Sequence, residues 1–195
     1  MRSIPFTSFS FAPLAGAFCS LLLTCFLAGC GKDDPVKSAE ARPRTRFYEY
    51  GSKIFFGAGG DSERFRLMGW STTEGGFTWT DGIAASVNLR VLPSKGPVTL
   101  NVRTVGMNHQ PILMFQPVDV FVNRTKIAHW EVAEDKVYSA TIPQEFVASE
   151  TNLIIDFYIP EARSPADLGL GGDFRRLGLR CAELEIIEQG SAGTP

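Results

Sequence analysis

Along residues 46–189, hydrophobic and polar positions alternate with a period of two, which is typical of strands with one buried face. The clearest runs cover residues 83–91, 98–103, 118–122, 153–159 and 177–186. In the last run the apolar positions change phase after Cys181, and this change predicts a β-bulge near Ala182-Glu183. Because no long segment has the 3.6-residue period of a helix, the pattern predicts an all-β domain.

Turn-forming residues separate these runs and indicate how they connect. Residues 93–97, with two prolines and a glycine, predict a hairpin between the first two runs. Asn123-Arg124 predicts a tight turn before a further strand at 126–132, because Asn tolerates positive φ. Residues 143–148 begin with proline and predict one short helical turn. Together these features predict an antiparallel β-sandwich of seven to nine strands, jelly-roll-like or galactose-binding-like.

The N-terminal residues predict export and lipidation. A single basic residue, Arg2, precedes an apolar stretch from Leu14 to Leu27, which has a suitable length for a secretory signal. The sequence Leu27-Ala28-Gly29-Cys30 matches a bacterial lipobox, so cleavage would make Cys30 the diacylated mature N-terminus. The alternatives are an uncleaved anchor or an ordinary signal. The apolar stretch is short for a span of about 20 residues, and ordinary cleavage needs no cysteine.

The lipobox also predicts the location of the protein and the division of the chain. We expect a signal peptide at 1–29, the lipidated cysteine and a flexible tether at 30–45, a domain at 46–189 and a frayed tail at 190–195. The acyl chains on Cys30 would hold the protein in a lipid bilayer of the cell envelope. By resemblance to enterobacterial sorting rules, Gly31 after this cysteine favours the outer membrane over the inner membrane.

Composition narrows the classes of function. Arg2 is the one charged residue of the predicted signal, so the remaining chain has 18 Lys and Arg against 21 Asp and Glu. This slight acidic balance argues against a nucleic-acid partner. Cys19 and Cys25 lie in the signal and Cys30 is the lipidation site, which leaves Cys181 alone and excludes an internal disulfide.

Residues 68–82 depart from the alternation and form the first candidate site. This segment combines Trp70 and Trp79 with Glu74 and several small residues in an expected loop before the strand at 83. Indole faces can stack on sugar C–H groups, and carboxylates accept hydrogen bonds from hydroxyls. The segment is therefore a candidate carbohydrate platform. The structural alternative is that both tryptophans plug one end of the sandwich and Glu74 satisfies buried backbone amides.

Residues 164–178 form the second candidate site, in a glycine-rich segment before the last strand. Asp173 can pair with Arg175 or Arg176, and a guanidinium can present two parallel donors to a sugar or an acid. The alternative is that the Asp–Arg pair only fastens this loop to the sandwich. The glycines are no nucleotide-binding fingerprint, because no strand–loop–helix unit surrounds them.

Other catalytic and metal-binding patterns are weak or absent. His109 and His129, the two histidines, lie in different segments without metal-ligand spacing, so we expect no metal, no cofactor and no catalytic residue. No GxSxG motif is present, which argues against an esterase. Glu74 with Asp81 or Asp173 would serve a glycosidase only if the pair flanked a cleft at a defined separation.

The two candidate segments together resemble an uncharacterised bacterial β-sandwich domain attached to envelope glycosyltransferase and phosphoglycerol-transferase-like membrane proteins. The resemblance runs from about Ile54 to Ile187 and depends on two motifs and two shorter matches. They are Gly69-Trp70-Ser71 with Glu74, Trp79-Thr80 and Gly82; Ser164-Pro165 with Leu168-Gly169, Asp173 and Arg175 to Leu179; Val122-Asn123; and Asn152-Leu153. Arg124 departs from the pattern, which often has Gly there, and no glycosyltransferase region precedes the domain. The resemblance implies an accessory, non-catalytic module on a lipid anchor.

Three functions stay open from the sequence. The leading hypothesis is a binding module for envelope or exported polysaccharide, in which Trp70 or Trp79, Glu74 and the Asp173–Arg176 segment meet on one exposed surface. The second is a protein-interaction or scaffold lipoprotein of an envelope assembly, which would expose a contiguous apolar patch. The third is a glycan hydrolase, which needs suitably spaced carboxylates in a cleft.

Overall fold

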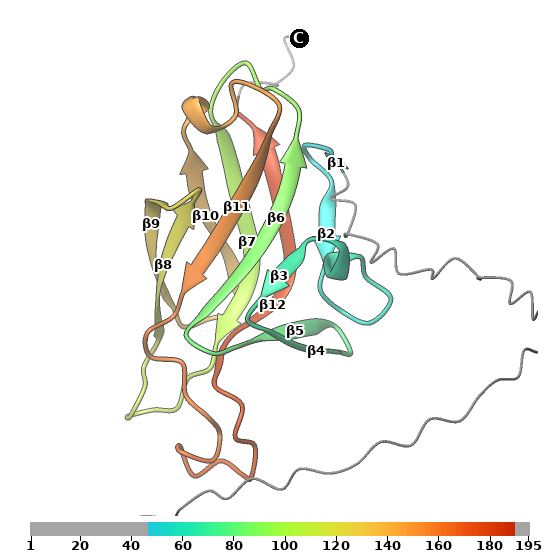
Figure 1. Cartoon of the computed structure of the whole chain (residues 1–195). Coiled ribbons are helices and arrows are strands. Elements are labelled where there is room, and N and C mark those ends of the chain that lie inside the picture. Colours follow the sequence, from blue (N-terminus) through green and yellow to red (C-terminus); the bar gives the residue numbers. More distant parts are fainter. Residues whose placement is uncertain (1–46, 190–195) are drawn as a thin grey trace, which may run out of the picture. The chain divides into compact units, whose positions relative to one another are not determined.

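The computed structural model describes residues 47–189, which form two packed β-sheets (Figure 1). The strands are β1 (Phe47–Tyr48), β2 (Lys53–Phe55), β3 (Arg66–Met68), β4 (Trp70–Glu74), β5 (Phe77–Asp81), β6 (Ala84–Val91), β7 (Val98–Gly106), β8 (Gln116–Val122), β9 (Thr125–Val132), β10 (Lys136–Ile142), β11 (Thr151–Tyr158) and β12 (Leu177–Glu188). Two short 3-10 helices, η1 (Ser62–Arg64) and η2 (Gln144–Phe146), complete the described elements.

The strands divide into a β6 sheet and a β12 sheet. The β6 sheet has the order β1-β6-β11-β8-β9, with β3 also paired to β6. The β12 sheet has the order β10-β7-β12-β5-β4, with β2 also paired to β12. From β9 to β12 each strand lies in the other sheet from the strand before it, as in a jelly roll. The predicted fold class, an antiparallel β-sandwich, is confirmed.

Two details of the connections differ from the sequence-based expectation. Residues 93–97 close no hairpin, because β6 and β7 lie in different sheets and the segment crosses between them. The turn-forming residues correctly indicate that the chain reverses direction here. Which sheet each strand joins depends on long-range pairing, of β6 with β11 and of β7 with β12. Residues 47–189 also contain twelve strands rather than seven to nine, because β1 to β4 are two to five residues long and too short to show a period.

Other local predictions are confirmed. The pairing of β12 with β7 shifts register between Cys181 and Glu183, which is the predicted bulge. Asn123 and Arg124 have φ of 47° and 73° and link β8 to β9 in a two-residue turn, so positive φ is tolerated even where Arg replaces Gly. The predicted helical turn after Pro143 is η2.

The core lies between the two sheets. Strands β7, β8 and β11 each bury every second side chain, as their sequence pattern predicts. The buried Cys181 thiol faces this core, and burial raises its pKa to about 12.

The described residues begin after the predicted signal and tether. Cys30 and the segments 1–29, 30–45 and 190–195 lie outside the described residues, so lipidation and the domain boundaries stay predictions. Within residues 47–189, no helix has the length and apolar character required to cross a membrane.

Candidate functional site

Residues 70–81, expected as a loop, form an antiparallel hairpin of β4 and β5, so that prediction is wrong. The entry to β4 requires glycine: Gly69 has a φ of 74°, and a Cβ there would lie 1.9 Å from the Ala84 carbonyl oxygen. Along β5 the usual pattern is inverted, because Thr78 and Thr80 are buried while Phe77 and Trp79 are partly exposed. This inversion hid the strand from an analysis that looks for apolar side chains on the buried face.

The inward face of the hairpin is fixed by hydrogen bonds. The Thr78 hydroxyl donates to the Phe56 carbonyl oxygen at 2.5 Å, and the Thr80 hydroxyl accepts from the Leu179 amide at 2.9 Å. Trp70 also belongs to this face: its indole N–H donates to the Ser86 carbonyl oxygen at 2.8 Å. Its ring packs on Phe56 with centroids 4.9 Å apart. The structural alternative therefore describes Trp70 well.

The outward face of the same hairpin carries Ser71, Glu74, Phe77 and Trp79. Glu74 is the register partner of Phe77, and Trp79 is the partner of Arg180 on β12. The rings of Phe77 and Trp79 meet edge to face at 6.1 Å, and the Arg180 guanidinium lies 5.0 Å from the Phe77 ring centroid. Stacking of this kind fixes the aromatic rings while leaving part of their surface open.

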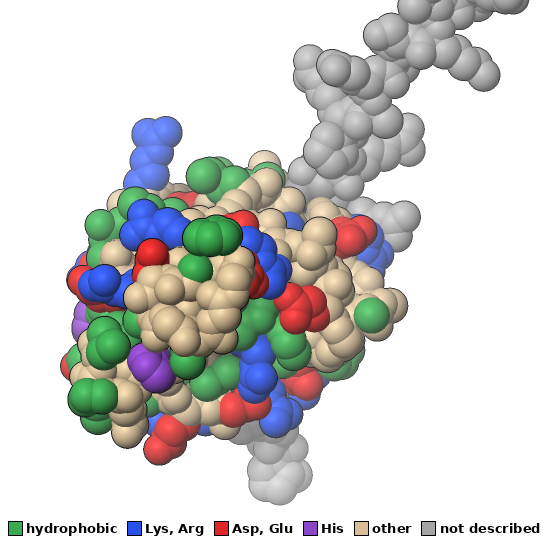
Figure 2. Space-filling model, turned by 90° about the horizontal axis from the view of Figure 1, so that it is seen from below, with side chains coloured by type: hydrophobic (Ala, Val, Ile, Leu, Met, Phe, Trp, Pro, Cys, Tyr) green, Lys and Arg blue, Asp and Glu red, His purple; other side chains and the backbone are tan. Residues whose placement is uncertain are grey.

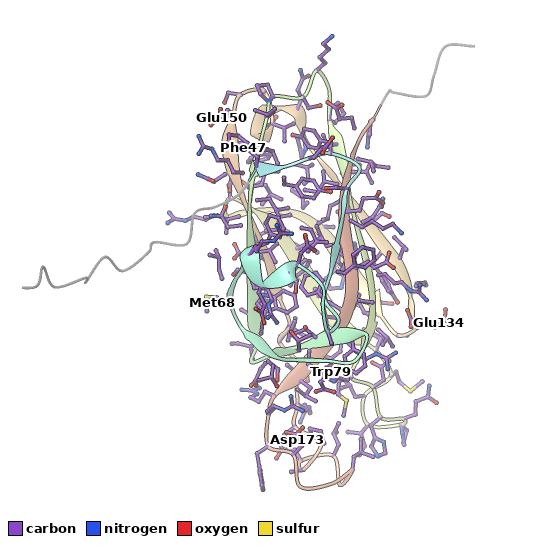
Figure 3. All side chains as sticks on the ribbon, turned by 90° about the vertical axis from the view of Figure 1, so that its right-hand side faces the viewer. Phe47, Met68, Trp79, Glu134, Glu150 and Asp173 are labelled. Atoms are coloured by element: carbon purple, nitrogen blue, oxygen red, sulfur yellow. The ribbon has the colours of Figure 1, made fainter. Side chains whose placement is uncertain are left out.

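Arg175 joins the two candidate segments. Its guanidinium donates to the Ser71 hydroxyl at 2.5 Å and to Glu74 Oε1 at 3.3 Å. The same group forms two-nitrogen contacts with Asp173, with Nη2 at 2.7 Å from Oδ2, and the Arg175 backbone N–H donates to Oδ1 at 2.9 Å. Figure 3 shows the loop that carries Asp173 below the hairpin that carries Trp79. Glu74, Asp173 and Arg175 thus meet beside Trp79's face of the hairpin.

Asp173 and Arg175 each favour the charged form of the other. Hydrogen bonds from Arg175 lower the pKa of Asp173, and the bond to Asp173 raises the pKa of the Arg175 guanidinium. The three side chains are paired with one another yet stay 33–38% exposed. They are therefore held in fixed positions and still reach solvent, as groups that bind a hydroxyl-rich ligand must.

The remaining candidate, Arg176, has a different environment. Its guanidinium donates to the Ala162 carbonyl oxygen at 3.2 Å, and its backbone N–H donates to Asp81 Oδ1 at 3.0 Å. The bond to Ala162 lies within the loop, and the bond to Asp81 fastens the loop to the hairpin. Of the six candidates, Glu74, Trp79, Asp173 and Arg175 share one region, Trp70 turns inward and Arg176 holds the backbone.

Three further side chains of this region were not among the candidates: Ser71, which the sequence analysis names only within a motif, Phe77 and Arg180. The alternation of aromatic residues with threonines at 77–80 was the sequence signal that could have indicated Phe77. Nothing in the sequence indicates Arg180, because its role depends on the pairing of β12 with β5. Arg66 supports the region from within, since its guanidinium donates to the Ser71 carbonyl oxygen at 3.3 Å, and burial lowers its pKa.

Outside this cluster, another group of paired charges lies on β8 and β9. His129 accompanies Lys126 around Asp119, with the His129 Nδ1 2.6 Å from Oδ1, and their hydrogen bonds, that of Lys126 first, lower the pKa of Asp119. Among residues 47–189, no group of three or more His, Cys, Asp and Glu side chains could hold a metal ion. Seen from the loop end, hydrophobic side chains form small separate groups among charges of both signs (Figure 2).

Comparisons with known proteins find a structural likeness only. No family model and no curated protein sequence matches the chain. Among solved structures, the C-terminal CBM6 of LamC, a laminarinase from Zobellia galactanivorans, is 12% identical with a TM-score of 0.43, and the match covers 70% of this chain and 98% of that one.

A second match is the CBM36-1 domain of a multidomain xylanase from the hindgut metagenome of Trinervitermes trinervoides. It is 13% identical with a TM-score of 0.42, covering 71% of this chain and 98% of that one. A third, a CBM36 in complex with calcium and xylotriose, is 12% identical with a TM-score of 0.40, and the match covers 69% of this chain and 98% of that one. These neighbours are carbohydrate-binding modules built as β-sandwiches. At such scores the likeness carries no argument about the ligand of this chain.

Proposed function

We propose that this protein is a lipid-anchored lipoprotein of the bacterial cell envelope whose β-sandwich binds carbohydrate and does not cleave it. The observation that carries the binding proposal is the cluster around Arg175, in which an ordered guanidinium and two carboxylates adjoin the partly exposed rings of Trp79 and Phe77. Sugars offer an apolar C–H face and a rim of hydroxyls, and this region offers aromatic surface beside fixed donors and acceptors.

The charges of the cluster favour binding over hydrolysis. A glycosidase needs one carboxylic acid that keeps its proton near neutral pH. Asp173 has the opposite tendency, because Arg175 lowers its pKa. Glu74 bonds to the same guanidinium. A binding site, in contrast, gains from carboxylates that stay ionised and accept hydrogen bonds.

The anchoring part of the proposal depends on Cys30, which lies outside the described residues. We propose that acyl chains on this cysteine hold the domain in the outer membrane. Expression with a labelled fatty acid tests this directly: the protein should carry the label and partition with membranes. Cys30→Ser should lose both properties, and a labelled Cys30→Ser protein would contradict the assignment.

Calorimetry tests carbohydrate binding. The full chain, in a detergent without a sugar headgroup, is titrated with neutral β-linked gluco- and xylo-oligosaccharides. We expect saturable binding that Trp79→Ala weakens about tenfold, the loss of one aromatic contact. Phe47→Ala is the matched control, because Phe47 is an exposed aromatic that stacks with Arg90 on the β6 sheet and lies far from Trp79 in Figure 3. Equal affinities for all three proteins would contradict the proposed site.

A protein partner is the alternative. The second hypothesis calls for a contiguous exposed apolar patch, and the exposed Ile112, Met114, Leu170 and Phe174 are the large apolar side chains of the two long loops. Figure 2 shows the hydrophobic side chains of this end in small groups, separated by charged and other polar atoms. At this end of the sandwich the Arg175 cluster beside aromatic rings therefore favours carbohydrate binding over a protein partner.

A further inference from the structure

A line of aromatic side chains extends beyond the hairpin along β12. Strand β5 pairs with residues 177–181 of β12, and β2 pairs with residues 183–185 on the same side. The two short strands therefore follow each other end to end. The hydrogen bond from the Thr78 hydroxyl to the Phe56 carbonyl oxygen, 2.5 Å long, joins them at the point where one ends and the other begins.

This arrangement brings Phe55 into line with Phe77 and Trp79. Ile54 and Phe56 are buried, whereas Phe55, between them, is 47% exposed on the outward face. Its register partner on β12 is Glu183, three residues beyond Arg180, the partner of Trp79. Three partly exposed aromatic rings thus lie beside residues 180–183 of β12 on one face of the β12 sheet.

A pocket of about 340 Å³ opens at the join between β5 and β2. It is lined by Phe55, the loop 57–60, the hairpin turn 75–76, Ala182 and Glu183. The loop and the turn touch: the Ala58 amide donates to the Gly75 carbonyl oxygen at 2.8 Å. A Cβ on Gly57 would lie 2.8 Å from that oxygen, so this close contact requires glycine there.

The glycines of the hairpin turn, in contrast, are not required by the backbone. Neither Gly75 nor Gly76 has a positive φ, and a Cβ on either would meet nothing within 4 Å. A larger residue therefore fits the fold, but its side chain would occupy open space at the pocket. These positions offer substitutions that obstruct the pocket without disturbing the hairpin.

The cations beside the line are paired, which indicates the kind of ligand. Lys53 binds Glu183 at 2.9 Å, and Arg180 lies 3.5 Å from Asp135. Arg175 binds Glu74 and Asp173. An anionic ligand would have to break one of these pairs to reach a cation. An uncharged, hydroxyl-rich ligand can bond to them as they stand, because paired carboxylates keep free lone pairs.

We propose that the Trp79–Phe77–Phe55 line binds a neutral glycan chain of several units, lying along β12, with one unit on Trp79 and another at the Phe55 pocket. This inference deepens the proposed function and rests on it. Two separated contacts on one chain act together, so affinity rises with chain length until both are engaged. A site at the hairpin alone would gain nothing from additional units.

The test is a length series from glucose to cellohexaose, and the corresponding β-1,3-linked series, titrated into the full chain by calorimetry. We expect wild-type affinity to increase at least tenfold over one of these series. Phe55→Ala should lose about tenfold for the longest oligosaccharides and nothing for the shortest that bind. Trp79→Ala should weaken binding at every length, and Phe47→Ala at none.

A second variant guards against an indirect effect of Phe55→Ala on β2. Gly76→Leu obstructs the pocket from the hairpin turn and should reproduce the length-dependent loss with an unchanged melting temperature. If both variants bind every oligosaccharide as wild type does while Trp79→Ala fails, the extended line is refuted and the proposed function stands. No binding by wild type at any length refutes both, and preference for oligogalacturonates over neutral chains refutes the assignment of an uncharged ligand.

Discussion

The two faces of the β4–β5 hairpin differ in what their side chains contact. On the inward face, the polar atoms of Trp70, Thr78 and Thr80 are hydrogen-bonded to backbone groups of neighbouring segments. On the outward face, Phe77 and Trp79 are partly exposed to solvent. Glu74 pairs with Arg175, whose side chain is about one third exposed. One hairpin thus serves as a plug on one side and as a candidate binding surface on the other.

This difference resolves a choice that the sequence leaves open. The sequence does not distinguish the two tryptophans, so a structural plug and a binding platform are alternatives for both. In the structure the period-two alternation of a strand separates them. Trp70 is the register partner of the buried Thr80 and shares its inward face, whereas Trp79, the residue before Thr80 on β5, points to the opposite side. A tryptophan that turns inward contributes stability, and one that turns outward is free to contribute binding.

Replacing Trp70 gives the largest expected effect. Trp70→Ala removes the ring packed on Phe56 and leaves the Ser86 carbonyl oxygen without its donor. We expect a loss of about 3 kcal/mol in the free energy of unfolding, near the low end for tryptophan because the ring is only partly buried. Trp79→Ala, measured beside it by urea denaturation, should lose less than about 1 kcal/mol. Equal losses of unfolding free energy in the two variants would contradict the proposed difference between the faces.

Replacing Thr80 tests the polar side of the inward face. Thr80→Val keeps the shape of the side chain and removes the hydroxyl that accepts from the Leu179 amide. A buried amide without its partner is destabilising, so we expect a loss of about 1–2 kcal/mol. Thr72→Val, on an exposed position of β4, is the control and should change stability by less than about 0.5 kcal/mol. A neutral Thr80→Val would mean that the buried threonines are replaceable by ordinary apolar residues.

The sequence predicts the sandwich well because its long strands alternate cleanly. Strands β7, β8 and β11 bury each predicted apolar position, and even the bulge after Cys181 follows from a change of phase. The hairpin was missed because β5 buries threonines and exposes aromatics. A pattern of apolar residues cannot report a strand whose buried side chains are hydroxyls held by hydrogen bonds.

The sequence predicted the contacts of the candidate site only where oppositely charged residues lie close together in the chain. Asp173 and Arg175 are two positions apart, so their pairing follows from the sequence. The contacts of Arg175 with Ser71 and Glu74 span about a hundred residues and depend on the pairing of β12 with β5. The alignment of Phe55 with Phe77 was equally inaccessible, because it requires two separate strands to share one side of β12.

Removing the Arg175 guanidinium should loosen the outward face with little effect on the core. Arg175→Gln removes the side-chain link from the 160–176 loop to Ser71 and Glu74 and leaves the backbone link at Arg176. We therefore expect faster hydrogen exchange at amides of residues 164–175 and weaker oligosaccharide binding. Because the group is partly exposed, the melting temperature should fall by no more than about 3 °C. Arg176→Gln, which keeps the contact with Glu74, is the matched control for binding. Unchanged exchange in Arg175→Gln would show that the loop needs no such link.

The smallest expected effect is a pH dependence specific to the outward face. Because Arg175 lowers the pKa of Asp173 in the folded chain, its stabilising contribution is present above the ordinary aspartate pKa of about 3.9. It is lost as the pH falls through the lower, folded value. Thermal melts from about pH 6 to about pH 2 should therefore show a shallower acid decline for Asp173→Asn than for wild type.

Asp119 contributes in the same direction from the β6 sheet, where hydrogen bonds from Lys126 and His129 lower its pKa. The decline in Asp173→Asn should therefore be reduced and not abolished, and the double variant with Asp119→Asn should reduce it further. Asp167→Asn is the control, because Asp167 lies in the same loop and forms no ion pair within residues 47–189. If Asp167→Asn alters the acid decline as much as Asp173→Asn does, the effect belongs to the charge of the loop and not to the pair with Arg175. The outward face would then lack the fixed carboxylate on which the binding proposal depends.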